Sequence, residues 1–229
     1  LFMKNKKRIV HLCLDEKWTK GAYYLFEKAF PGQNIYIHIN DKLTRRLKHI
    51  NYIESLIKTT PIKFKKNKDK LLYGADLVVL HSLKFKHVVA MSNTTLSSKV
   101  LWLIMGADVY QNEHIYNKEI LSVKTKRLFN KLEQKAYFKN VLRYLLSKFI
   151  YGTFVSNENK KRINAKFAKK IKFAATFQEE QFDLLKKNNA ISSNAKHLHF
   201  AFYPLEYIIT DKNFKSNDVN NNILLGNSA

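Results

Sequence analysis

The sequence predicts an α/β fold, a Rossmann-like parallel sheet flanked by helices. The clearest observation is a continuous apolar run at residues 100–105 that ends in a small loop at 106–108, as in an interior strand of a parallel sheet. Strand-like segments also alternate with helix-like segments along the chain, which is typical of βαβ units. Because ligands of open α/β sheets bind outside the carboxyl ends of the strands, the loop at 106–108 marks a predicted site.

The same pattern returns at residues 223–229, where an apolar run leads into Gly226-Asn227-Ser228. We interpret this segment as the opening strand and loop of a second α/β domain whose remainder is missing. The polar segment 210–222 has the composition of a linker. The predicted organisation is therefore a domain at 1–209, a linker at 210–222 and the beginning of a truncated second domain at 223–229.

The elements of the first half are predicted from periodicity and from breaker residues. Helix 19–30 is stopped by Pro31-Gly32, with Thr19 or Asp15 as its expected cap, and segment 34–39 alternates as a strand does. The predicted strands are 8–14, 34–39, 61–65, 76–81 and 99–105, and the predicted helices are 19–30, 51–58 and 83–91.

The second half begins with a long helical region at 117–150. After it, strands are predicted at 154–156, 171–175 and 197–202, helices at 157–169 and 179–187, and a loop at 188–194.

Composition narrows the class of protein. The 229 residues include 41 Lys and Arg against 18 Asp and Glu, a formal net charge of +23, which implies attraction to phosphate groups or reflects a base-composition bias in the coding DNA. The single cysteine, Cys13, excludes an internal disulfide and is expected to be a small core residue in a reducing compartment. Neither a transmembrane helix nor a secretory signal is expected.

A row of basic residues recurs at spacings of three or four within 117–150, beside apolar residues. A basic amphipathic helix is typical of an element that lies on a membrane surface, and an ordinary packed helix with a solvated charged face is the alternative. The predicted membrane-surface residues are Lys124, Arg127, Lys131, Lys135, Lys139 and Arg143.

No Walker loop, dinucleotide fingerprint, nucleophile elbow or metal-spaced Cys/His set occurs, so the chemical candidates are polar residues at strand ends. Asp15 follows the first predicted strand and is a candidate general base, or alternatively a helix cap. His81 is a candidate for binding an acceptor or phosphate, or alternatively a structural histidine. Asp108 follows two small residues that allow close approach of a ligand, or alternatively it bonds its own turn. The loop at 226–228 would bind a donor phosphate through its backbone N–H groups if a helix follows.

Taken together, these motifs and their order resemble glycosyltransferase family 56, the family of TDP-N-acetylfucosamine:lipid II N-acetylfucosaminyltransferases. The family's I-H-V-L strand is matched by residues 10–13, and its W-x-x-W-G-A-D-L-Y-E hallmark by residues 102–111. Its middle strand that ends in His is matched at His81, its Phe-Pro before the linker at Tyr203-Pro204, and its I-L-V-G-N-S-G at 223–229. The resemblance spans the whole chain but only the amino-terminal half of the family's length. Three departures occur, at Met105, Gln111 and Ala229.

The resemblance implies the amino-terminal domain of a GT-B glycosyltransferase. The domain at 1–209 would be the acceptor side, and 223–229 would begin the donor-binding domain. The donor would be a TDP- or UDP-linked deoxyamino- or deoxyhexose, with no cofactor and no metal. The acceptor would be an undecaprenyl-pyrophosphate-linked or other surface-polysaccharide glycan at the cytoplasmic face of the inner membrane. The implied acceptor-binding residues are His11, His81, Asp108 and Tyr110, with Asp15 as base and Gly226, Asn227 and Ser228 at the donor phosphate.

Two other classes stay open. A nucleic-acid-binding module fits the charge of +23 and the many Tyr and Phe residues, but Arg is scarce and no nucleic-acid-binding signature occurs, so no nucleic-acid partner is expected. A catalytically inactive scaffold of a glycan assembly complex is the other alternative. This chain alone, without most of a donor domain, is expected to be inactive.

Overall fold

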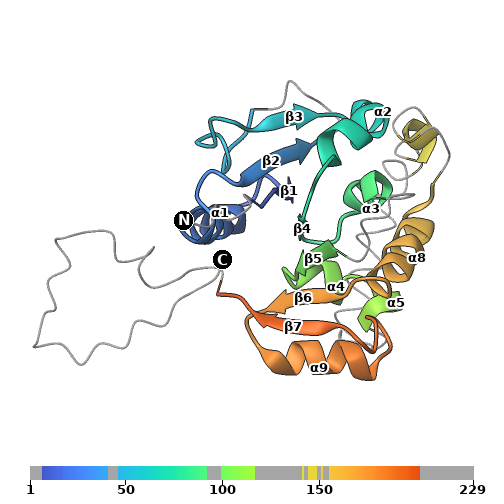
Figure 1. Ribbon diagram of the computed structural model, residues 1–229. Helices are drawn as coiled ribbons and strands as arrows, with labels where there is room; N and C mark the ends of the chain where they lie inside the picture. Colours follow the sequence, from blue (N-terminus) through green and yellow to red (C-terminus); the bar gives the residue numbers. More distant parts are fainter. Residues whose placement is uncertain are drawn as a thin grey trace, which may run out of the picture.

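Seven parallel strands form one sheet in a computed structural model that describes residues 7–40, 46–91, 99–116, 141, 144–148, 151 and 155–201 (Figure 1). The strand order is β3-β2-β1-β4-β5-β6-β7, and every neighbouring pair is parallel. The strands are β1 (Ile9–Cys13), β2 (Asn34–Ile39), β3 (Ile57–Thr59), β4 (Leu77–His81), β5 (Val100–Leu103), β6 (Phe173–Thr176) and β7 (Lys196–His199). The predicted Rossmann-like α/β class is thus confirmed.

Helices cover both faces of the sheet. They are α1 (Lys17–Ala29), α2 (Pro61–Leu72), α3 (Phe85–Met91), α4 (Ala107–Tyr110), α5 (Glu113–Tyr116), α8 (Asn157–Ala168) and α9 (Glu179–Lys187). Helix α1 lies on one face beside β1 and β2, and α2, α3 and α8 lie along the other (Figure 1). The handedness of crossovers explains this division. From β1 to β3 the chain moves toward one edge of the sheet, and from β4 to β7 toward the other, so right-handed connections place their helices on opposite faces.

The core is divided between these two faces. The larger cluster packs β-strand residues such as Leu12 and Trp102 against Phe64 of α2, Val88 of α3 and Phe167 of α8. The smaller cluster packs Ile9, Val79 and Leu103 against Ala22 and Phe26 of α1. All five residues of β1 are buried, as expected for a parallel strand covered on both sides.

Strands β1, β2, β4, β5, β6 and β7 lie within a few residues of the predicted strands. Three other assignments are wrong. Segment 61–65 is the start of α2, because Pro61 fits the first helical turn and the Thr60 hydroxyl accepts a hydrogen bond from the Lys63 N–H, 3.2 Å apart. Segment 51–58 is mostly turns and ends in β3. Val155 and Ser156 are not in a strand.

Two further differences from the sequence-based prediction concern the helices. The short helices α4 and α5 have no counterpart in the sequence-based prediction. Helix α1 begins at Lys17, and its N-cap Glu16 makes no side-chain cap bond, so neither Thr19 nor Asp15 caps it. The Thr19 hydroxyl instead donates to the Leu14 carbonyl, 2.8 Å away, and fixes the turn out of β1.

Within the described ranges, no helix is both long and apolar enough to cross a membrane.

Candidate functional site

The chain reverses its direction across the sheet between β1 and β4, which are hydrogen-bonded neighbours. In open α/β sheets this switch point, at the carboxyl ends of the strands, is where ligands bind. Polar residues gather there on β1, β2 and β4 and on the segments that follow them. We call this set the switch-point cluster; it consists of Asp15, His38, His81, Ser82 and His87.

His81 is joined to β1 by a buried chain of hydrogen bonds. Its Nε2 lies 3.1 Å from Nδ1 of His11, and Nε2 of His11 lies 3.1 Å from Oδ1 of Asn34. The Asn34 amide in turn donates to the carbonyls of Phe26 and Phe30 at the end of α1, at 3.2 and 2.7 Å. These hydrogen bonds therefore run from the end of α1, across the sheet face that α1 covers, to the switch point.

Packing holds the His11 ring in place within this chain. The ring stacks on Tyr36 at a centroid distance of 4.5 Å and meets Phe26 edge-on at 4.6 Å. Burial lowers the pKa of His11 to about 3, although the hydrogen bond with Asn34 acts in the opposite direction. Burial also lowers the pKa of His81 well below its ordinary value, and the nearby His11 and His87 add to the effect. Both imidazoles are therefore neutral at physiological pH.

Asp15 follows β1, as predicted, and the strand order places it at the switch point. Its carboxylate accepts hydrogen bonds from the backbone N–H groups of Lys48, at 3.0 and 3.1 Å, and His49, at 2.8 Å. Partial burial raises the pKa of Asp15, but these backbone bonds and the charges of His38 and His49 outweigh it, so the pKa is lowered. Asp15 is thus an ionised, half-buried carboxylate that fastens the segment before β3 to the end of β1. Its role as a base stays a prediction.

Ser82 and His87 form the opposite side of the switch point. Ser82 has a backbone φ of 69°, in the left-handed region that residues other than glycine rarely adopt. Its carbonyl accepts a hydrogen bond from the His87 ring at 3.3 Å. Burial lowers the pKa of His87 to about 3, with the Lys86 charge adding to the effect. Strained, buried polar residues of this kind gather at functional sites.

The histidines of the cluster share one environment. His38, at the end of β2, bonds through Nδ1 to the Cys13 carbonyl, 3.1 Å away. It affects the pKa of both Asp15 and His87, so the ends of β1, β2 and β4 form one electrostatic neighbourhood. His38 and His87 were not among the residues predicted from the sequence. The signal for His38 was its place near the carboxyl end of an alternating strand; His87 gave none, because it lies inside an apolar helix.

Asp108 follows β5, and both of its carboxylate oxygens are engaged inside the protein. Oδ2 accepts from the Trp102 indole at 2.7 Å and from the Leu83 N–H at 2.9 Å, and Oδ1 accepts from the Met105 N–H at 3.1 Å. Asp108 is 7% exposed and ties the loop after β4 to the loop after β5. It therefore bonds its own turn, as one reading of the sequence expected, and its acceptor-binding role stays a prediction.

Tyr110 lies two residues after Asp108 in α4 and is 41% exposed. Its hydroxyl accepts a hydrogen bond from the Gln181 amide of α9 at 2.7 Å. Gly106 precedes α4 with a φ of 82°, which permits the tight turn between β5 and this helix. Tyr110 is thus accessible at the carboxyl edge, whereas His11 and His81 are wholly enclosed.

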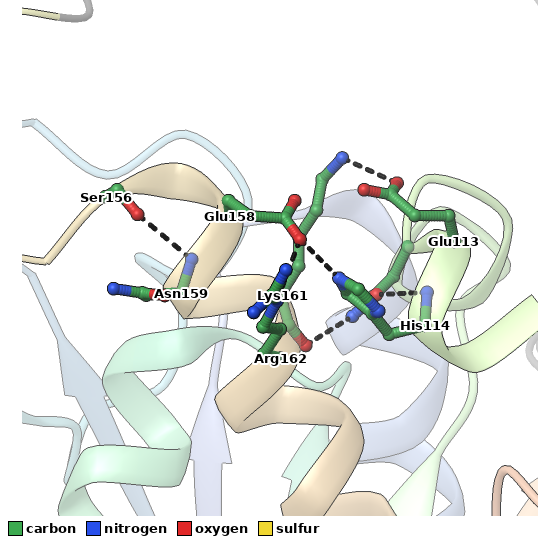
Figure 2. A network of polar contacts seen from close by, with 8 residues as sticks. Glu113, His114, Ser156, Glu158, Asn159, Lys161 and Arg162 are labelled. Atoms are coloured by element: carbon green, nitrogen blue, oxygen red, sulfur yellow. Dashed lines mark hydrogen bonds and ion pairs between the residues drawn. The ribbon is translucent and has the colours of Figure 1, made fainter.

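A second polar network joins α5 to α8 (Figure 2). Glu113, His114 and Glu158 have ligand atoms within 4.8 Å of one another, a spacing that a metal ion tolerates. Each carboxylate already has a cation, however: Lys161 lies 2.8 Å from Glu113, and Arg162 lies 3.0 Å from Glu158, which also bonds His114 at 2.6 Å. A divalent ion would have to displace these cations or lie beside them. The network therefore acts as an ion-pair bridge between two helices.

Other predicted residues lie outside the described part of the chain. They are the membrane-surface residues Lys124, Arg127, Lys131, Lys135, Lys139 and Arg143, the donor phosphate residues Gly226, Asn227 and Ser228, the Tyr203-Pro204 pair, and the segments 210–222 and 223–229.

With this geometry established, comparison with known proteins adds no relative. The chain matches no protein-family model, no curated protein and no solved structure. What the fold defines is the class, an α/β protein with a seven-stranded, all-parallel, Rossmann-like sheet.

The role of Asp108 generates a stability prediction. The Asp108→Asn change replaces a carboxylate oxygen, which accepts N–H bonds, with an amide that donates. Hydrogen bonds to a buried charge contribute about 1.5–3 kcal/mol, so we expect the free energy of unfolding to fall by about 2–3 kcal/mol. Urea unfolding followed by tryptophan fluorescence measures this. Asp183→Asn, on the exposed side of α9, is the matched control and should change stability by under about 0.5 kcal/mol. Equal effects of the two variants would contradict the assignment.

Proposed function

We propose that this chain is the acceptor-side domain of a GT-B glycosyltransferase. It would transfer a hexose, such as N-acetylfucosamine or fucose, from a nucleotide diphosphate sugar to a lipid-linked or surface-polysaccharide glycan. The observation that carries the proposal is the strand order. Asp15, His81 and Asp108, on which the family resemblance rests, follow β1, β4 and β5, which are adjacent, so all three lie at one edge of the sheet. That is the edge at which α/β sheets bind ligands.

In the proposed reaction Asp15 removes the proton from an acceptor hydroxyl. The hydroxyl oxygen attacks the anomeric carbon of the donor, the bond to the nucleotide diphosphate breaks, and the diphosphate leaves. Asp15 supports this role by being ionised and held in a fixed orientation by the N–H groups of Lys48 and His49. The donor would be TDP- or UDP-linked and would be bound at its phosphates by Gly226, Asn227 and Ser228 and by the domain that follows them.

The test is an assay of nucleotide diphosphate release by the full-length protein from TDP- and UDP-sugars, with membrane extract as acceptor. Donor-specific release is expected, and Asp15→Asn should lower it by roughly 10²- to 10⁴-fold, the usual contribution of a general base. Asp76→Asn is the matched control, because Asp76 also anchors a backbone N–H, that of Arg8, but at the opposite edge of the sheet. Absence of release with every donor, from a folded full-length protein, would contradict the transferase and favour a scaffold.

We infer further that the protein docks on anionic lipid at the cytoplasmic face of the inner membrane. Residues 144–148 are helical, and Val141, Tyr144 and Leu145, spaced as on one helix face, are 39, 43 and 49% exposed. Lys148 is exposed one turn beyond them. Exposed apolar residues beside basic ones, in a chain of net charge +23, suit a surface of acyl chains and anionic headgroups.

Sedimentation with phosphatidylglycerol–phosphatidylcholine vesicles tests this docking. Leu145→Asp should weaken binding about tenfold or more, since it removes the burial of a leucine and adds a negative charge. Leu198→Asp is the matched control, because Leu198 is 44% exposed on β7, far along the chain, and should leave binding unchanged. Binding should also weaken as salt rises. Equal binding by Leu145→Asp and the parent chain, or binding that ignores the anionic lipid, would contradict the docking surface.

A further inference from the structure

The hydrogen bonds around His81 determine which of its ring nitrogens carries the proton. The Asn34 amide nitrogen donates to two carbonyls, so its Oδ1 must accept a hydrogen bond from a protonated Nε2 of His11. His11 is neutral, which leaves its Nδ1 without a proton and able only to accept. His81 must then donate from Nε2 to that nitrogen. The Nδ1 of His81 therefore carries no proton, and we call such an unprotonated ring nitrogen bare.

This bare nitrogen has no hydrogen-bond partner among the residues that the structure describes, although His81 is 0% exposed. Ser82 and His87 each have a buried polar atom in the same condition. His87 donates from Nδ1 to the Ser82 carbonyl, so its Nε2 is also bare, and this atom and the Ser82 hydroxyl likewise lack a described partner. Leaving a buried polar atom unsatisfied is costly, and native proteins rarely do so in clusters. Three such atoms within seven residues indicate a place built for something else to bind.

The chemistry of these atoms selects the ligand group. Two bare imidazole nitrogens accept hydrogen bonds and cannot donate them, and the serine hydroxyl does both. A phosphate or pyrophosphate at neutral pH offers mainly acceptor oxygens, so the bare nitrogens would repel it. A hydroxyl group, by contrast, donates the hydrogen bond that each of these nitrogens can accept.

We propose that the switch point is a saccharide-hydroxyl site, in which Nδ1 of His81 accepts a hydrogen bond from a sugar hydroxyl, with Ser82 and His87 beside it. This deepens the proposed function, on which it rests, by stating that the site takes the glycan of the acceptor and not its pyrophosphate. His11 and Asn34 are positioning residues that hold His81 in the accepting tautomer. The backbone of Ser82, at φ 69° in the left-handed region, turns the chain directly after His81. Because His81 is 0% exposed, the residues that enclose it must move before a hydroxyl can reach it.

Imidazole ¹⁵N NMR of the full chain, labelled at histidine, tests the proposal with two probes, N-acetylglucosamine and inorganic pyrophosphate. A bare imidazole nitrogen resonates far downfield and moves upfield when it accepts a hydrogen bond. N-acetylglucosamine should move the Nδ1 signal of His81 upfield in a saturable manner, and pyrophosphate should not. A response to pyrophosphate alone, or to neither probe, would overturn the proposal.

Variants give a second readout by calorimetry with the same saccharide. His81→Phe keeps a ring of similar size but removes the acceptor, so affinity should fall about tenfold, the equivalent of one hydrogen bond. His114→Phe, in the surface network of Figure 2, is the matched control and should bind as the parent chain does. If His81→Phe does not fold, the NMR titration of the parent chain still decides the question.

The two proposals fail in different ways. Saccharide binding at His81 without turnover of any nucleotide sugar by the full-length protein would reject the transferase and keep the site. Turnover without any response of His81 to the saccharide would keep the transferase and reject the site.

Discussion

The hydrogen bond between His11 and His81 is the interaction around which the switch point is organised. It joins two parallel neighbours, β1 and β4, from which the chain proceeds toward opposite edges of the sheet. Both rings are fully enclosed, so they must be neutral and must satisfy their protons inside the protein. Asn34 meets this demand at one end of the chain of bonds. At the other end lies Nδ1 of His81, which has no partner among the described residues. The polar character of the site therefore follows from how the sheet face is packed.

Around this centre, backbone-binding carboxylates fix the loops. Asp15 holds the segment before β3 at the end of β1, and Asp108 holds the loop after β4 against β5. A charge that accepts several N–H bonds positions a loop more firmly than a neutral side chain does. The carboxyl edge is thus a set of loops held by acids around a histidine-rich centre, in which His11, His81 and His87 are neutral. Exposed lysines lie elsewhere, for example on α2.

Much of the fold could be predicted from the sequence because it depends on local patterns. The apolar runs of β1, β4 and β5 and the alternation of β2 are signals carried by neighbouring residues, and they gave strands within a few residues of those observed. Segment 61–65 misled because its Phe64 and alternating lysines resemble a strand, whereas Pro61 and the Thr60 cap start a helix whose buried face is Pro61, Phe64 and Leu72. The short helix α4 packs against α5, and α5 packs against α8, contacts that no local pattern encodes.

The candidate site could be predicted only in part. Asp15, His81 and Asp108 were found because strand ends are recognisable, but their partners come from distant segments: Lys48 for Asp15, Leu83 for Asp108 and His11 for His81. Those contacts decide whether an acid is free or engaged, and they depend on strand order. Strand order is a tertiary property, so spacing alone could not separate a catalytic carboxylate from a structural one.

The pH dependence of unfolding tests the account most directly, since it asks whether the central histidines are buried and neutral. The pKa of His11 and of His87 is lowered from 6.5 to about 3 in the folded chain, so below pH 6.5 the unfolded chain takes up protons that the folded chain does not. The stabilisation is thus complete above pH 6.5 and is lost as the pH falls toward 3. Each such histidine should add about 1.4 kcal/mol per pH unit to the slope, and His87→Phe should remove one such contribution. A free energy of unfolding that stays flat from pH 7 down to the range where carboxylates titrate would contradict the buried histidine chain.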